Sequence, residues 1–465
     1  MLELIFDCIA RACRQIIDCT DDRFFEEFQA ISSDYEQQLE ADFKREIPSF
    51  FDGGHYRMLN VDDLSSRSYF ARELSSALKI ATQNNDFDKA LFFIKYVCPA
   101  FEKYICQLTI ITSDYSSFDY LNSNSQETNI IVLPKVRANW QHSNMWKYFD
   151  YSINNFLTNI YIIDITKIKG NYKIKNYVLS YDLFAEEIEK GKIVIGISPI
   201  TCKACINFNN IEIKDVNGKE YFSVNQLQHA EEITENIKSI YSEARKYGVN
   251  ILVFPEMLGT QEQIQQIQKL YLEESNTQNI NNPQITVMPT IWKDRNNYSN
   301  ILIGQLNKPV TQKKTFRYPY QDEDGAIFLE DLDLENEVTI NIFHIEGIGR
   351  VIVAICKDLL MRKHLDFLIG DLKASIILVP SFSTGDYPFK MISYYGFPYD
   401  CNIVWINSCA ARHLLKKPND SFETIGVTYN PSRSGTDGCV KEYKNSACDG
   451  QCNKCLFTFE LNLKE

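Results

Sequence analysis

The sequence has no apolar run that approaches the ~20 residues of a membrane-spanning helix. Glycine and proline are scarce, with 19 and 14 copies in 465 residues, which excludes collagen-like and low-complexity chains. Cations are outnumbered, because 48 Lys and Arg face 61 Asp and Glu and leave a net charge of −13. Since phosphate binding requires clustered cations, we expect neither nucleic acid nor a membrane among the partners.

The chain also lacks the features of an export signal. Its first residues, MLELIFDCIARACRQIIDC, have no basic segment before the apolar part and are typical of an amphipathic helix. Fourteen cysteines without such a signal indicate a reducing compartment, so we expect a cytoplasmic protein with free thiols. With 45% hydrophobic residues, the composition is that of a globular protein, and the length suggests two or three domains.

Two common catalytic patterns are missing. None of the histidines, at positions 55, 142, 229, 344, 364 and 413, lies in a motif beside a cysteine, which argues against a Cys-His protease. There is no glycine-rich phosphate loop of the Walker or dinucleotide type. We therefore expect no use of a nucleotide.

The first half of the chain is predicted to be mainly helical. Apolar residues recur at helical spacing from Leu2 to Ile17, and further helices are expected at about 21–46, 62–83 and 86–110. Residues 112–127 are predicted to form a loop, and 128–186 fit either helix or strand. Because this half has no catalytic motif, we predict that residues 1–187 form a domain of unknown role, for packing or for binding a protein partner.

The second half, residues 188–465, is predicted to be an α/β domain. A helix is expected over 226–247 and a hairpin over 342–356, around Gly347 and Gly349. Short apolar runs rich in β-branched residues predict buried strands at 192–200, 250–257, 284–292, 300–306, 375–381, 402–408 and 456–463. An acidic segment, 321–337, is expected to be a solvated loop.

Three reactive side chains stand at or after the ends of these strands. Glu256 ends NILVFPE, Cys356 ends VIVAIC, and Lys314 lies in QKKTFRYP, where Lys313 is the alternative. Ligands of α/β sheets bind beyond the carboxyl ends of strands, so these groups are candidates for one site. A thiol attacks as thiolate, a half-buried carboxylate can take its proton, and an ammonium can stabilise the resulting oxyanion, an effect worth about 3 kcal/mol per donor.

The same segments resemble the carbon–nitrogen hydrolase, or nitrilase, superfamily over about 192–463. VNILVFPEM resembles its glutamate motif, Lys314 followed by Pro319 its lysine motif, and VIVAICKDLL its cysteine motif. ASIILVPSFS and YDCNIVWINSCAAR resemble later segments of the family, and the first makes Ser381 and Phe382 candidates for the substrate pocket. The resemblance implies a four-layer α-β-β-α sandwich, a Glu256-Lys314-Cys356 triad and an assembly that is often a homodimer.

The chain departs from the family at several positions around the triad. Lys357 follows the nucleophile where Glu or an aromatic residue is usual, although its backbone amide can still serve the oxyanion. Asp358 stands at a commonly acidic position. Asp322 or Glu323 is the candidate for the second glutamate that the family often has after the lysine.

The resemblance implies an amidase-like hydrolase that forms a thioester on Cys356, acts on a small amide or nitrile and needs no metal or organic cofactor. An amidase is favoured over a true nitrilase, because amide chemistry dominates the superfamily. Two alternatives stay open: a catalytically weak scaffold or sensor that binds a ligand or protein, which Lys357 motivates, and an N-acyltransferase that uses the same thioester.

The remaining cysteines allow two interpretations. Four of them form two CxxC pairs, Cys202 with Cys205 and Cys452 with Cys455, and together they would complete a four-thiolate zinc site if the fold brings them together. Otherwise they are reduced thiols in surface loops, as the family resemblance does not require zinc.

Overall fold

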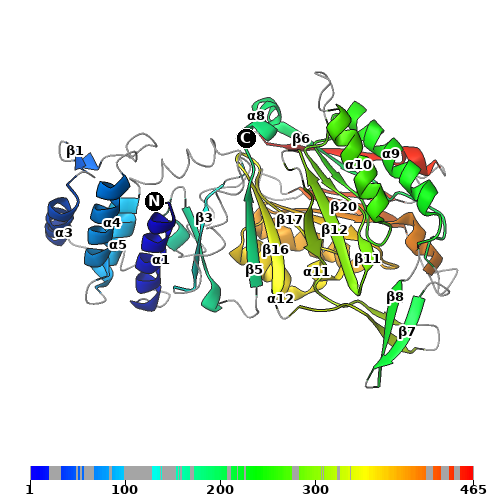
Figure 1. Ribbon diagram of the computed structural model, residues 1–465, viewed down its shortest axis with the longest axis horizontal. Helices are drawn as coiled ribbons and strands as arrows, with labels where there is room; N and C mark the ends of the chain where they lie inside the picture. The colour runs from blue at the N-terminus through cyan, green and yellow to red at the C-terminus, as the bar shows by residue number, and fades with distance from the viewer. Residues whose placement is uncertain are drawn as a thin grey trace.

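The fold is mixed α/β, with helices at the N-terminal end and sheets in the rest of the chain (Figure 1). None of the helices described is long and apolar enough to cross a membrane. The computed structural model describes residues 2–19, 33–48, 51–52, 55–56, 67–82, 86–98, 128–136, 138, 153–155, 157, 160–167, 172–206, 211–216, 218–224, 227–274, 282–304, 306, 308–321, 325–335, 337–414, 423–430, 439–444 and 451–463.

Helices dominate the described residues before 100, as the sequence predicts. Their apolar faces form a core of their own, to which α1 contributes Phe6, Ile9 and Ile16. The predicted stretches 21–32, 62–66 and 99–110, and the predicted loop at 112–127, lie outside the described residues. The elements are α1 (Leu2–Cys19), α3 (Ser33–Glu46), β1 (Phe51–Asp52), β2 (His55–Tyr56), α4 (Arg67–Ala81), α5 (Phe87–Phe92) and the π-helical turn η4 (Phe93–Val97).

A two-stranded ribbon, β3 (Ile130–Pro134) with β4 (Ile160–Asp164), lies between two hydrophobic cores. Side chains alternate along a strand, so each face of the ribbon packs on a different core. Ile130, Val132, Ile160 and Ile162 belong to the helical core. Ile131, Leu133, Tyr161 and Ile163 belong to the larger core of the C-terminal part. The ribbon therefore joins the two parts of the molecule.

Two seven-stranded sheets make up most of the C-terminal part. In the first, the order is β11-β12-β10-β9-β6-β22, with β13 also paired to β12. Its strands are β6 (Lys192–Ile197), β9 (Ile251–Val253), β10 (Ile285–Val287), β11 (Ile291–Lys293), β12 (Asn296–Ile303), β13 (Val310–Lys313) and β22 (Phe457–Asn462).

The second sheet has the order β21-β20-β19-β18-β17-β16-β5. The predicted hairpin is present, as β16 and β17 pair antiparallel around Gly347 and Gly349, whose φ angles of 80° and 91° favour glycine. The strands of this second sheet are β5 (Tyr172–Val178), β16 (Val338–Ile345), β17 (Gly349–Val353), β18 (Ile376–Ser381), β19 (Asn402–Asn407), β20 (Thr424–Asn430) and β21 (Cys439–Lys444).

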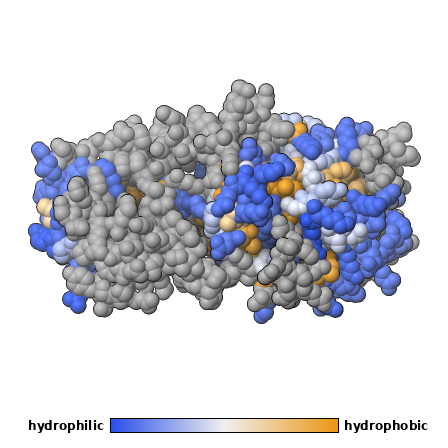
Figure 2. Space-filling model, turned by 90° about the horizontal axis from the view of Figure 1, so that it is seen from above, coloured by the Kyte–Doolittle hydropathy of each residue, from blue (hydrophilic) through white to orange (hydrophobic). Residues whose placement is uncertain are grey.

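The two sheets pack closely against one another. A Cβ on Gly426 of β20 would lie 2.8 Å from Ile197 Cδ1 of β6, so no larger residue fits there without a shift. Helices α9 (Ala230–Lys246) and α10 (Gln261–Glu274) lie side by side over the first sheet (Figure 1). Phe389 of α13 stacks on Trp405 of the second sheet, with ring centroids 4.7 Å apart. The surface seen in Figure 2 is largely hydrophilic, with small apolar patches, where residues are described.

The other elements connect or extend these layers. A smaller sheet has the order β14-β15-β8-β7, and its β7–β8 hairpin projects from the body (Figure 1). The helices are α8 (Ala185–Lys190), α9 (Ala230–Lys246), α10 (Gln261–Glu274), α11 (Lys357–Leu360), α12 (Arg362–Asp366) and α13 (Tyr387–Ser393). The strands of the smaller sheet are β7 (Ile211–Val216), β8 (Lys219–Val224), β14 (Pro319–Gln321) and β15 (Ile327–Glu330).

The domain division at 187/188 stays a prediction, and the position of β5 supplies a test of it. This strand lies before the division yet pairs with β16 from Tyr172↔Val338 to Val178↔His344. A fragment of residues 188–465 would lose β5 and expose the core that the ribbon covers. We expect it to aggregate or to melt well below the full chain, as judged by gel filtration and thermal melting. Equal melting temperatures for 188–465 and the full chain would contradict this.

Candidate active site

Glu256 lies three residues after β9 and is fully buried. Its carboxylate accepts a hydrogen bond from Asn297 Nδ2 at 2.8 Å and another from the backbone N–H of Phe382 at 3.0 Å. Its own N–H donates to the carbonyl oxygen of Ser381 at 3.2 Å. Ser381 ends β18 of the second sheet. The carboxylate of Glu256, which lies in the loop after a strand of the first sheet, is therefore fixed by backbone at the end of a strand of the second sheet.

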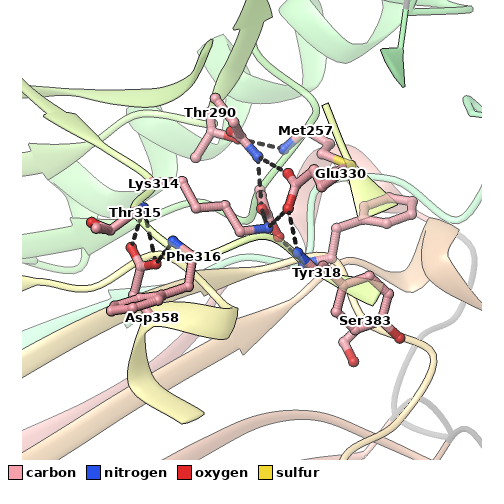
Figure 3. Close-up of polar contacts among 12 residues, drawn as sticks. Met257, Thr290, Lys314, Thr315, Phe316, Tyr318, Glu330, Asp358 and Ser383 are labelled. Atoms are coloured by element: carbon pink, nitrogen blue, oxygen red, sulfur yellow. Dashed lines mark hydrogen bonds and ion pairs between the residues drawn. The ribbon is translucent and has the colours of Figure 1, made fainter. Parts of the chain in front are cut away.

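Lys314 directly follows β13 and carries its ammonium into the same buried place. Its Nζ lies 2.7 Å from Glu256 Oε1 and 2.7 Å from Glu330 Oε2, and its side chain is 1% exposed. Figure 3 shows the Lys314 side chain reaching Glu330. Burial alone would lower the pKa of Lys314, but the charges of Glu256 and Glu330 outweigh it and hold that pKa well above its ordinary value. The ammonium is therefore retained.

The neighbouring Lys313, the alternative in the sequence, is half exposed and forms an ion pair with Glu335 at the surface. Successive residues of a strand point to opposite sides, which explains why adjacent lysines have such different surroundings. The structure thus places Lys314, and not Lys313, beside Glu256.

Glu330 is a site residue that the sequence interpretation missed. The acidic segment was expected to be a solvated loop, and at Glu330 this is wrong, because the residue ends β15 and is fully buried. Its carboxylate also accepts hydrogen bonds from the N–H of Tyr318 at 3.0 Å and from Asn297 at 3.1 Å. Burial raises the pKa of Glu330, opposed by the charge of Lys314. Asp322 and Glu323, the candidates for a second glutamate, lie outside the described residues.

Cys356 forms the turn between β17 and α11 and is 2% exposed. Its backbone has φ 48° and ψ −104°, a strained conformation for a residue with a side chain. Burial raises the pKa of its thiol, as do the charge of Glu256 and a hydrogen bond to that carboxylate, while Lys314 acts in the opposite direction. The resting thiol is therefore protonated and lies beside a carboxylate that can take its proton.

The residues after Cys356 complete this turn. Lys357 is partly exposed, and its backbone N–H, at the first position of α11, has no acceptor in the part of the chain that the structure describes. The N–H of Cys356 is already donated to the carbonyl oxygen of Pro380 at 2.9 Å. Of these two amides, only that of Lys357 is available to an oxyanion at the thiol.

Asp358 ties α11 to the segment that carries Lys314. Its buried carboxylate accepts the N–H groups of Thr315 at 3.0 Å and Phe316 at 2.8 Å, the two residues after the lysine (Figure 3). Asp358 therefore fixes Lys314 relative to Cys356.

The surroundings of Asp358 give a test by pH. Burial raises its pKa to about 7 from 3.8, while the charge of Lys314 and the two backbone hydrogen bonds lower it. The folded state thus binds the proton more tightly, and the stability that this supplies is present below pH 4 and lost as pH rises through 7. Asp358→Asn removes this titration, so its unfolding free energy relative to the native chain should rise by about 1–3 kcal/mol between pH 5 and pH 8. Urea unfolding at both pH values measures it, and a difference between Asp358→Asn and the native chain that does not change with pH would contradict the prediction.

The two pocket candidates, Ser381 and Phe382, are both buried. The backbone carbonyl of Ser381 and the backbone N–H of Phe382 both form hydrogen bonds with Glu256, so these two residues position Glu256. Tyr318, which the sequence interpretation did not single out, also faces this region, since its pKa is raised by burial and by the charge of Cys356 and is lowered by a hydrogen bond with Thr384.

The four cysteines considered for zinc are only partly brought together. The sulfur atoms of Cys202 and Cys452 are 3.2 Å apart, whereas Cys205 is fully buried with a pKa raised to about 12 by burial. Among the described residues, no group of three or more His, Cys, Asp or Glu side chains is arranged to hold a metal ion.

No family model and no curated protein matches the chain. In structure it matches nitrilase-fold proteins over 56–59% of its length. The matches include a glutamine-dependent NAD+ synthetase from Acinetobacter baumannii (14% identity, 58% of this chain and 45% of that one, TM-score 0.35) and the C. elegans NitFhit protein (12%, 59% and 61%, 0.37). A glutamine-dependent NAD(+) synthetase from Cytophaga hutchinsonii also matches (12%, 56% and 44%, 0.29). The chain spans about half the length of these proteins, and at such values they carry no conclusion about its activity.

Proposed function

We propose that this chain is a cysteine-dependent hydrolase of non-peptide C–N bonds, an amidase rather than a nitrilase, built on the four-layer sandwich of the carbon–nitrogen hydrolases. One observation carries the proposal. A single ammonium, that of Lys314, is held at 2.7 Å from two fully buried carboxylates, beside a buried and conformationally strained thiol. Packing alone does not account for such a group, because burying charges is costly unless they are paired.

The first half of the reaction follows from these positions. Glu256 takes the thiol proton as the sulfur of Cys356 bonds to the carbonyl carbon of the amide. The oxyanion that forms is stabilised by the ammonium of Lys314 and by the N–H of Lys357. Glu256 then returns the proton to the leaving nitrogen, the C–N bond breaks, and ammonia or an amine departs from a thioester on Cys356.

The second half uses the same groups again. Glu256 removes a proton from a water molecule, whose oxygen attacks the thioester carbon, and the oxyanion is again stabilised by Lys314. The C–S bond breaks, the sulfur regains the proton, and a carboxylic acid leaves. Glu330 supports both halves of the reaction, because it also pairs with the ammonium of Lys314. The positive charge therefore stabilises the carboxylate of Glu256 less strongly, and Glu256 is a better base.

The test is a panel of small primary amides and nitriles with two readouts, ammonia release and the intact mass of the protein after rapid quenching. We expect ammonia release from at least one amide and a mass increase equal to the acyl group, mapped to Cys356. Acylation that turns over only when hydroxylamine is added would favour the N-acyltransferase alternative. No acylation by any member, together with slow and unselective alkylation of Cys356, would favour the scaffold or sensor.

The remaining expectations concern assembly and partners. A homo-oligomer, a protein partner for residues 1–187 and a cytoplasmic location stay predictions, and sedimentation of the full chain would test the first of them.

A further inference from the structure

A second pair of reactive groups lies outside the candidate active site. The Sγ atoms of Cys202 and Cys452 are 3.2 Å apart, and the N–H of Cys202 donates to Sγ of Cys452 at 3.2 Å. A disulfide bond is about 2.05 Å long, so an approach of roughly 1 Å separates this contact from a covalent bond. Both side chains are partly exposed, whereas Cys401 and Cys409, for example, are buried.

The sheet itself places these two cysteines together. β22 pairs antiparallel with β6, and Phe457 lies opposite Ile197 at the end of this ladder. Cys202 follows Ile197 by five residues, and Cys452 precedes Phe457 by five residues. The two cysteines are thus equally far along the chain from one pair of directly opposed strand residues. The segment with Cys452 forms a short helical turn, η14 (Cys452–Lys454). The contact is a consequence of strand register and not of a chance approach of two loops.

Charged and polar side chains lie around the Cys202 side of the pair. Lys203 lies close enough for the charges of Cys202 and Cys452 to raise its pKa, after the larger effect of its hydrogen bond to Glu232. The carbonyl oxygen of Cys202 also accepts hydrogen bonds from Arg412 at 3.2 Å and His413 at 2.8 Å. Access to solvent lets a small external disulfide reach these sulfur atoms, which thiol–disulfide exchange requires.

We propose that Cys202 and Cys452 form a reversible disulfide bond that anchors the C-terminal strand β22 to the sheet. The oxidant is a low-molecular-weight disulfide of the glutathione type. The thiolate of one cysteine attacks it, forms a mixed disulfide and releases one glutathione thiolate. The second cysteine attacks the protein sulfur of that intermediate and releases the other. Two protein thiols are oxidised, one glutathione disulfide is reduced to two thiols, and the two protons pass from the protein to glutathione.

The bond would have a measurable effect on the fold. The two cysteines are 250 positions apart, and a cross-link that closes so long a loop restricts the unfolded chain strongly. It would also fasten β22, an edge strand of its sheet, which among the described residues pairs with β6 alone. Oxidation should therefore raise the melting temperature, and dithiothreitol should reverse the rise.

The experiment uses the full chain, treated with glutathione disulfide, blocked with an alkylating reagent and digested without reduction. We expect a cross-linked peptide that joins Cys202 to Cys452, the loss of two titratable thiols and a higher melting temperature. Cys202→Ser and Cys452→Ser should each abolish all three changes. Cys455→Ser is the matched control, since it removes a partly exposed thiol three residues away and should leave them intact.

Three results would overturn the proposal. One is a cross-link that joins other cysteines in the chain without substitutions after treatment with glutathione disulfide. The peptide map detects such a cross-link even if a variant fails to fold. Another is stable mixed disulfides at Cys202 and Cys452 with no bond between them. The third is one zinc ion per chain, released by chelator, that protects these thiols from oxidation. None of these results depends on amidase activity, so this test and that of the proposed function fail independently.

Discussion

Replacing Cys356 with alanine should abolish ammonia release, with kcat/KM lower by about 10⁴-fold or more, because no other group at the site can form the thioester. The fold should survive, since the change removes one buried sulfur atom and no ion pair. Intact mass after quenching should show no acyl group on the variant. Cys401→Ala is the matched control, because Cys401 is also fully buried but lies outside the group formed by Lys314, Glu256 and Glu330. This variant should keep its activity.

The strain at Cys356 sharpens this prediction. Its φ of 48° with ψ of −104° is a conformation that glycine adopts without cost, and such strain typically costs a non-glycine residue about 1–3 kcal/mol. Cys356→Gly should therefore be as inactive as Cys356→Ala, yet unfold at a higher urea concentration than the alanine variant. A stable and active alanine variant would refute the nucleophile. A glycine variant no more stable than alanine would refute the stored strain.

The sequence predicted the three reactive residues because each stands at or just after the end of a short apolar strand, where packing alone does not call for a polar group. It did not predict Glu330, although Glu330 also ends a strand. Its neighbours are acidic, and an acidic run suggests solvent, so the pattern of the segment concealed its two buried carboxylates, Glu330 and Asp331, of which Glu330 contacts Lys314. Glu330 pairs with Lys314, sixteen positions earlier, only because the fold brings them together, so no pattern in the neighbouring residues indicates this ion pair.

The same reasoning explains the partial success with the fold. The strands at 192–200, 375–381 and 402–408 are continuous apolar runs, and the structure has β6, β18 and β19 there. Residues 172–178 read YKIKNYV, in which only the first four residues alternate apolar and polar, and nothing local indicates that the partner of this strand is β16, far along the chain. Long-range pairing is decided by the packed sheet and is not encoded in the segment.

Replacing Lys314 with methionine should damage both stability and activity. Methionine fills much of the space, but it leaves Glu256 and Glu330 fully buried without the cation that both contact at 2.7 Å. Removing one partner of a buried ion pair typically costs about 3–5 kcal/mol, so the unfolding free energy should fall by that order. Activity should fall at least 10²–10³-fold, about the loss expected for one oxyanion donor. Lys313→Met is the matched control, because that lysine is half exposed and should matter little to either quantity.

A second substitution separates the two effects. Adding Glu330→Gln to Lys314→Met removes one unpaired carboxylate and keeps an acceptor for the N–H of Tyr318. The double variant should therefore regain part of the lost stability in urea unfolding, while its activity stays low, because the oxyanion still lacks its ammonium. If activity returned together with stability, Lys314 would serve only to neutralise the buried carboxylates, and the stabilisation of the oxyanion would have to be assigned to the N–H of Lys357.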